Sequence, residues 1–430
     1  MLPRAFEKSI RGRRDFLQVG SAGLLGLSLG DLLGRQAARG AENPAPRARN
    51  VIMLFLTGGP ATIDMWDMKP AAPETIRGEF RPVDTSAPGV QICEHLPRLA
   101  SQMHLATLVR SATHTIAEHG QGTAYVMTGN RPSPAADYPS LGALSAALLK
   151  ANRGTPAYMT VGTVPSSGAG HLGATLNPFE VSLADGRTAS RIGLPEGFTI
   201  TDLDRRQAVL ERLDRRLSDL GSAPLSRQLQ SMQRDALDSL RSDKINQALD
   251  LEREPEPIRK QYGPTFAGRG ALAARRLIEA GARFVTIGFG DWDTHLNNFT
   301  RLRTSLLPEL DQALGALLAD LAERGLLDET IVYCTGEFGR TPHVNVSVGR
   351  DHWSRTMTAL LAGGGFRRGF VYGATDETGS EPERHPCSPD DVSASIFRQL
   401  GFSPSHHVQT RSGRPISLFQ NGRPLDEIVG

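Results

Sequence analysis

The sequence predicts an α/β fold: a mostly parallel sheet flanked by helices, with a helical hairpin inserted beside it. Continuous apolar runs of strand length recur along the chain, as is typical of parallel strands that are buried on both faces. Segments with helical spacing lead into later strands, and this helix-then-strand order favours parallel strands joined by right-handed crossovers. With 430 residues, of which 39% are hydrophobic and 22% charged, the chain is long enough to form one large domain.

Three apolar runs are the clearest strand candidates: residues 50–56, 282–289 and 329–335. A shorter strand is expected at 104–109, and weaker strand candidates lie at 157–161 and 198–201. Cys334 lies inside the last of the three strong runs, so we expect it to be a buried and inert thiol.

Helices are expected between these strands. Thr115 and Glu118 form the pattern of a capping box, which predicts a helix from there to about Met127. Further helices are predicted at 140–150, 268–280, 302–324 and 389–400. The inserted hairpin is predicted over about 202–260, with Pro224 dividing its two helices and Pro255 ending the second. Its dense charge indicates a solvated face, with a partner-binding surface as the alternative.

The first 41 residues have the features of a twin-arginine export signal. Arg13 and Arg14 precede a charge-free run over residues 16–30, and a stretch of small residues ends at Ala41. This apolar run is shorter than the roughly 20 residues that a spanning helix needs, which favours a cleaved signal over a permanent anchor. The sequence therefore predicts a single mature domain of residues 42–430 in the periplasm or cell envelope, without a transmembrane segment.

Charge argues against nucleic acid as a partner. Residues 1–41 contain seven Lys/Arg and three Asp/Glu, so their removal changes the formal net charge from +2 to −2. The basic balance belongs to the signal and not to a nucleic-acid surface. The turn at residues 57–60 lacks both the Gly-x-Gly-x-x-Gly fingerprint and the phosphate-loop Lys, which argues against nucleotide binding.

Polar, glycine-rich turns follow four of the predicted strands, at residues 57–67, 111–119, 290–295 and 336–341. Ligands in open α/β sheets bind at the carboxyl ends of strands, so these turns are expected to line one crevice. The loop 349–353 begins ten residues past Gly339, and we expect it to fold back over the same edge.

The turn at residues 291–295, Asp-Trp-Asp-Thr-His, is the strongest chemical signal in the chain. A strand that delivers carboxylates and an imidazole at its end offers the ligands of a divalent metal, with zinc first and manganese or calcium as alternatives. Glu337 and His352, in similarly unusual sequence, strengthen this interpretation. The alternative is that Asp291 or Asp293 only caps a helix that starts near Leu296.

Taken together, the motifs resemble an exported bacterial family, the domain of unknown function 1501. The residues that carry the resemblance are 58–60, 64–70, 113–114, 118–119, 128–129, 291–295, 336–342 and 349–353. The fold of that family is thought to be similar to the alkaline phosphatase and sulfatase superfamily. The resemblance implies a first metal held by Asp291, His295 and His352.

A second metal of that superfamily is only partly matched. Thr57 stands where an Asp is expected, Glu337 can replace a later Asp, and Phe338 replaces a His. This departure leaves two alternatives. Either the second metal is absent, or it is rebuilt from new positions, namely Asp64 or Asp67 with His114 or His119.

The nucleophile of the superfamily lies at the N-terminus of the helix after the second strand, where the helix dipole favours an oxyanion. Thr113 and Thr115 occupy this neighbourhood and are the candidate nucleophiles, with an N-cap as the alternative for Thr115. His119 lies four residues after Thr115, and three roles stay open for it: metal ligand, general base or packed polar residue. None of the three cysteines has the neighbours of a sulfatase nucleophile.

Arg340 follows Gly339 at a strand end, where a guanidinium could hold two oxygens of a phosphate or sulfate. Pairing with Glu337 or Asp351 is the alternative. The resulting hypothesis is an exported metal-dependent hydrolase acting on phosphate or sulfate esters, such as a sulfated or phosphorylated glycan. The rival, motivated by Thr57 and Phe338, is a hydrolase fold without catalysis that binds an anionic glycan or serves as an envelope scaffold.

Overall fold

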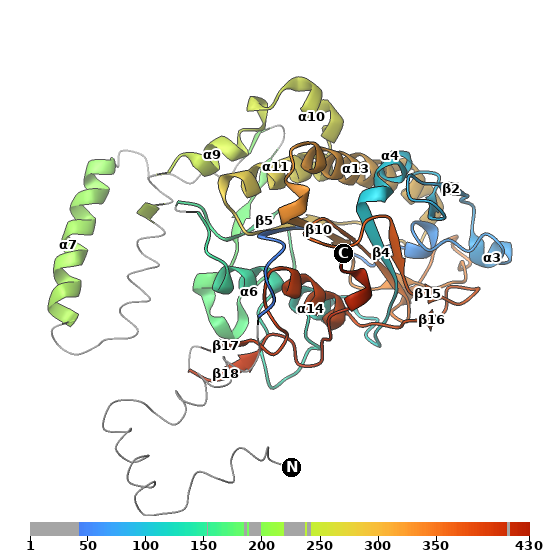
Figure 1. The fold of residues 1–430 in the computed structure, drawn as a ribbon. Helices are drawn as coiled ribbons and strands as arrows, with labels where there is room; N and C mark the ends of the chain where they lie inside the picture. The colour runs from blue at the N-terminus through green and yellow to red at the C-terminus, as the bar shows by residue number, and fades with distance from the viewer. Residues whose placement is uncertain are drawn as a thin grey trace, which may run out of the picture.

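An eight-stranded sheet forms the centre of the protein, with strand order β14-β4-β13-β10-β1-β9-β5-β6 (Figure 1). The computed structural model describes residues 43–152, 154–184, 187–188, 199–218, 237–238, 242–410 and 413–430. The strands of the sheet are β1 (Asn50–Leu56), β4 (Ala106–Ala112), β5 (Tyr158–Val161), β6 (Phe179–Val181), β9 (Phe284–Phe289), β10 (Thr330–Thr335), β13 (Met357–Ala362) and β14 (Phe370–Tyr372).

The strand directions confirm the predicted mostly parallel sheet. β1 pairs in parallel with β9 and β10, β5 pairs in parallel with β9 and β6, and β14 pairs in parallel with β4. β13 alone runs antiparallel to its neighbours β10 and β4. The carboxyl ends of β1, β4, β9 and β10 therefore share one edge of the sheet, where ligands of such folds bind.

β1 lies at the centre of the core because all seven of its residues are buried. Successive side chains of a strand point to opposite faces. Ile52 and Leu54 accordingly pack into one hydrophobic cluster, and Met53 and Phe55 pack into the other.

Helices cover both faces of the sheet (Figure 1). One layer contains α4 (Pro97–Gln102), α9 (Lys244–Leu249), α10 (Glu256–Tyr262), α11 (Phe266–Ala280) and α13 (Leu307–Glu323). The opposite layer contains α5 (His119–Thr128), α6 (Leu141–Leu148) and α14 (Pro389–Gln399). Leu272 of α11 and Leu317 of α13 join the cluster of Ile52, whereas Leu144 of α6 and Ile396 of α14 join the cluster of Met53.

Shorter elements complete the fold. The remaining helices are α3 (Glu74–Arg77), α7 (Ile200–Ser218) and α12 (Asn298–Arg301). In the described part of the chain, five two-stranded pairs lie outside the main sheet: β2 (Pro82–Asp84) with β3 (Gln91–Cys93), β7 (Leu183–Ala184) with β8 (Arg187–Thr188), β11 (Gly339–Arg340) with β12 (His352–Trp353), β15 (Ala374–Thr375) with β16 (Pro382–Arg384), and β17 (His407–Gln409) with β18 (Pro415–Ser417). Among the described residues, no helix has both the length and the apolar composition needed to cross a bilayer.

Several predicted elements need correction. The weak strand candidate at 198–201 is wrong, because α7 begins at Ile200. Pro255 does not end a helix but is the N-cap of α10. The predicted helix at 302–324 is interrupted, since residues 302–306 form a π-helix before α13. The predicted turn of the hairpin at Pro224 lies outside the described residues.

The prediction that Cys334 is a buried thiol is confirmed. It lies within β10 and forms no disulfide. Burial raises its pKa, which disfavours the reactive thiolate.

A buried ion pair ties the loop after β1 to the loop before β12. Asp64 and Arg350 are both fully buried. The carboxylate oxygens of Asp64 accept hydrogen bonds at 2.7 Å from Nε and Nη2 of Arg350, and Asn298 donates a third bond at 2.8 Å. Arg350 also donates to the backbone carbonyls of Thr341 and Ile76, at 3.0 and 2.8 Å. One guanidinium therefore joins four separate segments.

Replacement of Arg350 by Met should lower the free energy of unfolding by about 3–5 kcal/mol, because it leaves the Asp64 carboxylate buried without a counter-charge. Urea unfolding followed by circular dichroism measures this change. Arg355 is the matched control, since it is half exposed and pairs with Glu381 at 2.8 Å. The Arg355→Met variant should lose no more than about 1 kcal/mol. Equal losses in the two variants would contradict the structural role of Arg350.

Candidate metal centre

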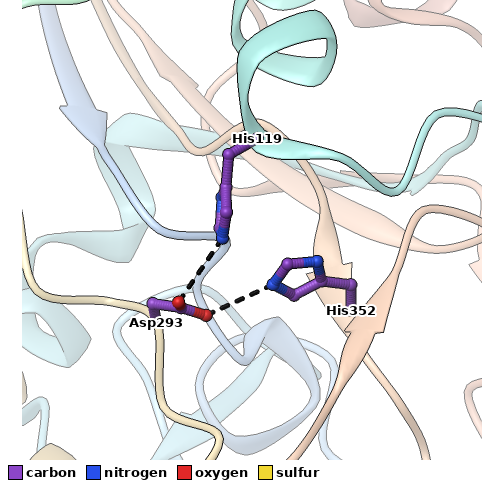
Figure 2. A group of neighbouring side chains, drawn as sticks. All are labelled: His119, Asp293 and His352. Carbon is purple, nitrogen blue, oxygen red and sulfur yellow. Dashed lines mark hydrogen bonds and ion pairs between the residues drawn. The ribbon is translucent and has the colours of Figure 1, made fainter.

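Four polar side chains meet at the sheet edge where β1, β4, β9 and β10 end. Asp293 and His295 lie in the loop after β9, His352 lies in β12, and His119 is the first residue of α5. Figure 2 shows the imidazoles of His119 and His352 directed toward the carboxylate of Asp293 from different elements. The fold thus brings together residues that lie up to 233 positions apart in the chain.

The spacing of these groups matches that of ligands around a shared cation. One atom each of His119, Asp293 and His352 lies within 4.8 Å of the others. Nε2 of His119 is 3.5 Å from Oδ2 of Asp293, and Nε2 of His352 is 3.3 Å from Oδ1 of Asp293. His295 extends the group, because its Nε2 lies 3.1 Å from Oδ1 of Asp293 and 3.0 Å from Nε2 of His352.

All three imidazoles are held at Nδ1 by a hydrogen-bond acceptor. The acceptors are Oε1 of Glu337 at 2.6 Å from His119, Oδ1 of Asp351 at 2.7 Å from His295, and the carbonyl of Ala117 at 2.9 Å from His352. This network assigns the ring hydrogen to Nδ1 in each histidine and leaves a lone pair on Nε2 toward Asp293. Outer partners of this kind fix the tautomer and the orientation of metal-binding histidines.

Two observations show that the donor set fits a divalent cation. The Nε2 atom of His119 is buried and has no hydrogen-bond partner. Nε2 atoms of His295 and His352 face each other at 3.0 Å, which requires a proton or a cation between the two lone pairs. Burial lowers the pKa of His352, and the charges of Arg340 and His119 contribute to the shift, so a proton on that ring is disfavoured. Imidazole nitrogens with one carboxylate are ligands that suit zinc.

Arg340 holds Asp293 in place and does not face the crevice. Its buried guanidinium donates to the carbonyls of Gly59 at 2.6 Å and Arg350 at 3.0 Å, and also to the carbonyl of Gly58 and to Oδ1 of Asp293. Burial raises the pKa of Asp293, but the hydrogen bond and charge of Arg340 outweigh it and lower the value to about 2. The predicted role of Arg340 in binding a phosphate or sulfate is corrected, because its guanidinium is fully buried and directed toward these acceptors of the chain itself.

Glu337 was predicted as a metal ligand but lies behind His119. Its carboxylate is fully buried, and Oε1 accepts a hydrogen bond from the amide of Gly58 at 2.9 Å as well as from His119. Both bonds direct this oxygen away from the Nε2 atoms, so Glu337 orients a ligand instead of being one.

Phe338 fills the space beside the cluster. Its ring centroid lies 5.1 Å from that of His119 and 4.7 Å from that of His352. A Cβ atom on Gly59, where φ is 71°, would lie 2.5 Å from the Phe338 ring, so a glycine is required there. Among the described residues, this apolar ring leaves no donor for a second cation at that position.

Asp293 occupies the place that the spacing assigned to Asp291. Asp291 has a φ of 71°, its side chain is exposed, and its carbonyl accepts a hydrogen bond from Arg301 at 2.8 Å. This left-handed turn directs Asp293, two residues later, toward the histidines. The capping alternative is wrong for both aspartates, because Asn297 is the N-cap of α12.

Asp64 also lies outside the cluster. Both of its oxygens are bound by Arg350 and Asn298, as described above. Asp67 is likewise engaged, with Nζ of Lys69 at 3.2 Å and with the hydroxyl of Thr375. The predicted rebuilding of a second metal site from Asp64 is therefore corrected, since buried ion pairing already uses its lone pairs.

Neither predicted threonine nucleophile belongs to the cluster. The hydroxyl of Thr115 is exposed and accepts a hydrogen bond from Arg131 at 2.7 Å. Thr113 is half-buried, and its amide donates to the carbonyl of Cys387 at 2.8 Å. No hydrogen bond of the described residues joins either of them to the four clustered side chains, and their role as nucleophiles stays a prediction.

The N-terminus of α5 differs from the prediction. Glu118, and not Thr115, is the N-cap, and its carboxylate accepts from the amides of Gly120 and Gln121 at 2.8 Å each. His119 is therefore the first helical residue. The positive end of the helix, where an oxyanion was expected, holds a carboxylate of the chain itself.

His114 has a structural role in this loop. Its Nε2 donates to the carbonyl of Glu337 at 2.8 Å, and its Nδ1 accepts from the amide of Ile116 at 3.2 Å. Burial lowers its pKa to about 4, so the ring is neutral near pH 7. With both nitrogens used by the backbone, His114 is not available to a metal.

Two acidic residues of the centre were not among the predicted metal ligands or their supports: Asp293 and Asp351. The only local signal for Asp293 is its Asp-x-His spacing to His295, which competes with the Asp-x-x-x-His spacing of Asp291. Asp351 directly precedes His352, but it supports His295 from across the site. Neither assignment can be read from spacing alone.

Solved structures with similar folds include a sulfatase, an alkaline phosphatase and a lipoteichoic acid synthase. The PsFucS1 sulfatase from Pseudoalteromonas sp. has a TM-score of 0.38 at 12% identity, covering 91% of this chain and 72% of that one. The alkaline phosphatase from the Antarctic bacterium TAB5 has a TM-score of 0.38 at 12% identity, covering 84% and 99%. The lipoteichoic acid synthase LtaP from Listeria monocytogenes has a TM-score of 0.33 at 10% identity, covering 89% and 77%.

The comparison with curated proteins gives no significant match. The match to a family covers nearly the whole chain, from residue 48 to residue 429, and includes every side chain of the centre. On this evidence, the chain belongs to the family described as "Protein of unknown function (DUF1501)".

Proposed function

We propose that this protein is a metal-dependent hydrolase of phosphate or sulfate esters. The observation that carries the proposal is that ligand atoms of His119, Asp293 and His352 lie within 4.8 Å of one another, with His295 beside Asp293 and His352. All three imidazoles are anchored at Nδ1. His119, Asp293, His295 and His352 would hold the cation, with zinc as the expected metal. The resemblance of the strand-end motifs to the alkaline phosphatase and sulfatase superfamily supports the choice of ester.

A divalent cation bound there would polarise an ester oxygen and lower the pKa of a water molecule toward neutrality. The protein's own residues prepare the site for this chemistry. Arg340 keeps the Asp293 carboxylate ionised and fixed, and Glu337 and Asp351 prevent rotation of two ligand rings. Water activated by the cation would be the nucleophile, with Thr113 and Thr115 as the alternatives that the sequence predicts.

The rival function is an anionic-glycan-binding or scaffold protein of the cell envelope. Thr57 and Phe338 favour it, because the resemblance assigns ligands of a second metal to these two positions. A measurement of ester turnover distinguishes the two functions, because only the hydrolase would convert its ligand.

Purified protein should contain about one zinc ion per chain, and His119→Ala and His352→Ala should each lose most of it, because each removes one of four ligands. Mass spectrometry of the metal content gives this number. The same samples, assayed with aryl phosphates, phosphate diesters and aryl sulfates, should show turnover only in the metal-loaded wild type.

His104→Ala is the matched control, since this exposed histidine bonds to Ser86 and lies outside the centre. It should keep both metal and activity. Metal that remains in both centre variants would reject the assigned ligands. Stoichiometric metal without turnover of any ester would instead support the rival.

Glu337→Gln should weaken metal affinity by about 10- to 100-fold, because the amide no longer offers a carboxylate to orient His119. Competition with a chromophoric chelator measures the affinity. Unchanged affinity would show that the Glu337 contact does not position the ring. Glu381→Gln, on an exposed ion pair, controls for loss of a surface carboxylate.

We further propose that the chain is exported by the twin-arginine route and acts in the periplasm or envelope. The support is the pattern of Arg13 and Arg14 before an apolar run. These residues lie outside the part of the chain that the structure describes.

Replacement of Arg13 and Arg14 together by Lys should retain the precursor inside the cell, because the twin-arginine pattern is lost while the charge is kept. Cell fractionation followed by immunoblotting measures the distribution. Replacement of Arg4 by Lys, outside the pattern, should leave export intact. Export of the double variant at the wild-type level would reject this route.

A further inference from the structure

We infer that the centre favours esters with a single negative charge, such as sulfate monoesters and phosphate diesters, over doubly charged phosphate monoesters. This inference rests on the proposed hydrolase function and narrows its substrate class. It follows from the distribution of fixed charge around the four proposed ligands.

Four carboxylates contact or border the cluster. Asp293 is a proposed ligand, and Glu337 and Asp351 accept hydrogen bonds from His119 and His295. Glu118 lies between His119 and Ala117, whose carbonyl accepts from His352, and its charge interacts with both histidines. The side chains of Glu118 and Asp351 are exposed, so an incoming anion would meet them.

The cations near the cluster are turned away from the position of a substrate. Among the described residues, Arg340 and Arg301 are the two whose hydrogen bonds reach the centre. Arg340 donates to Asp293 and to four carbonyls, and Arg301 donates to the carbonyls of Asp291 and Asp293. The four carboxylates contribute a formal charge of −4, the Arg340 guanidinium contributes +1 and a divalent cation would contribute +2. The formal charge around the site is then −1. The more distant pair of Arg301 and Asp291 cancels and does not alter this balance.

The start of α5 adds to this effect. Its amides, which would otherwise stabilise an anionic oxygen, are bound by the carboxylate of Glu118. A bound ester therefore gains attraction from the cation but meets repulsion from Glu118 and Asp351. Since the Coulomb energy is proportional to the charge, a dianion experiences twice the repulsion from these groups and twice the attraction to the cation. The formal charge of −1 around the site therefore makes the second negative charge unfavourable.

The matched esters methyl 4-nitrophenyl phosphate and 4-nitrophenyl phosphate test this inference, because they share the leaving group and the phosphorus but differ in charge. Zinc-loaded wild type should hydrolyse the monoanion with at least about tenfold higher kcat/KM than the dianion, as expected for one unit of extra repulsion at a partly screened site. 4-Nitrophenyl sulfate, the other monoanion, shows whether sulfur or phosphorus is preferred. Glu118→Gln removes one charge while keeping an oxygen that can cap α5.

Glu118→Gln should raise kcat/KM for the dianion by about 5- to 10-fold more than for the monoanion. Calorimetric titration with methylphosphonate and methanesulfonate, at a pH where the former is a dianion, provides a readout independent of turnover. In the variant, the affinity for methylphosphonate should increase relative to the affinity for methanesulfonate by a similar factor. Glu252→Gln, an exposed carboxylate paired with Arg259 outside the centre, should change neither ratio.

Metal-dependent turnover with a wild-type preference for the dianion, or with ratios that Glu118→Gln leaves unchanged, would overturn the inference and leave the proposed function intact. Absence of metal-dependent turnover of all three esters by the wild type would overturn the proposed function, and this inference with it.

Discussion

The buried guanidinium of Arg340 is the interaction on which the centre depends. It joins the carbonyls of Gly58 and Gly59, after β1, to the carbonyl of Arg350, before β12, and to the carboxylate of Asp293, after β9. Without this cation, the three carbonyls, which belong to buried residues, would lose this donor, at a cost of about 1–3 kcal/mol for each group. A planar group with five fixed donors suits this task, which a lysine ammonium could not perform in the same way. Arg340 thereby fixes the relative positions of three loops that are distant in sequence. The residues that would bind the metal are positioned by the same contacts.

The acidic residues around the cluster have two effects at once. Glu337 and Asp351 orient imidazoles, and Glu118 caps the helix that presents His119, so each has a local structural reason to be there. Their charges also add up to a field that an anionic substrate must enter. A bound cation would offset the mutual repulsion of these carboxylates, which otherwise makes such a cluster costly to assemble. The same acidic residues that position the metal-binding side chains thus restrict the charge of the substrate that can bind.

Much of the fold could be predicted because its signals are local. The apolar runs of β1, β9 and β10 are long and uninterrupted, and all their residues are buried. Predictions failed where a local signal had two outcomes. Residues 198–201 have strand-like composition, yet Ile200 starts a helix. Thr115 was a candidate N-cap of α5, but Glu118 is the N-cap. In both places, the choice between two acceptable local structures depends on contacts with the rest of the chain.

By itself, the sequence determined the α/β class, the strand ends that carry polar residues, and His295 and His352 as members of one site, because periodicity and strand-end position are properties of short segments. Only the tertiary structure decided that Asp293 and not Asp291 faces the histidines, that His119 completes the group, and that Glu337, Arg340 and Asp64 support the site from behind. These roles depend on which lone pairs and donors are already used by partners far along the chain. Spacing along the sequence holds no information about such partners, since they are fixed when the loops pack together.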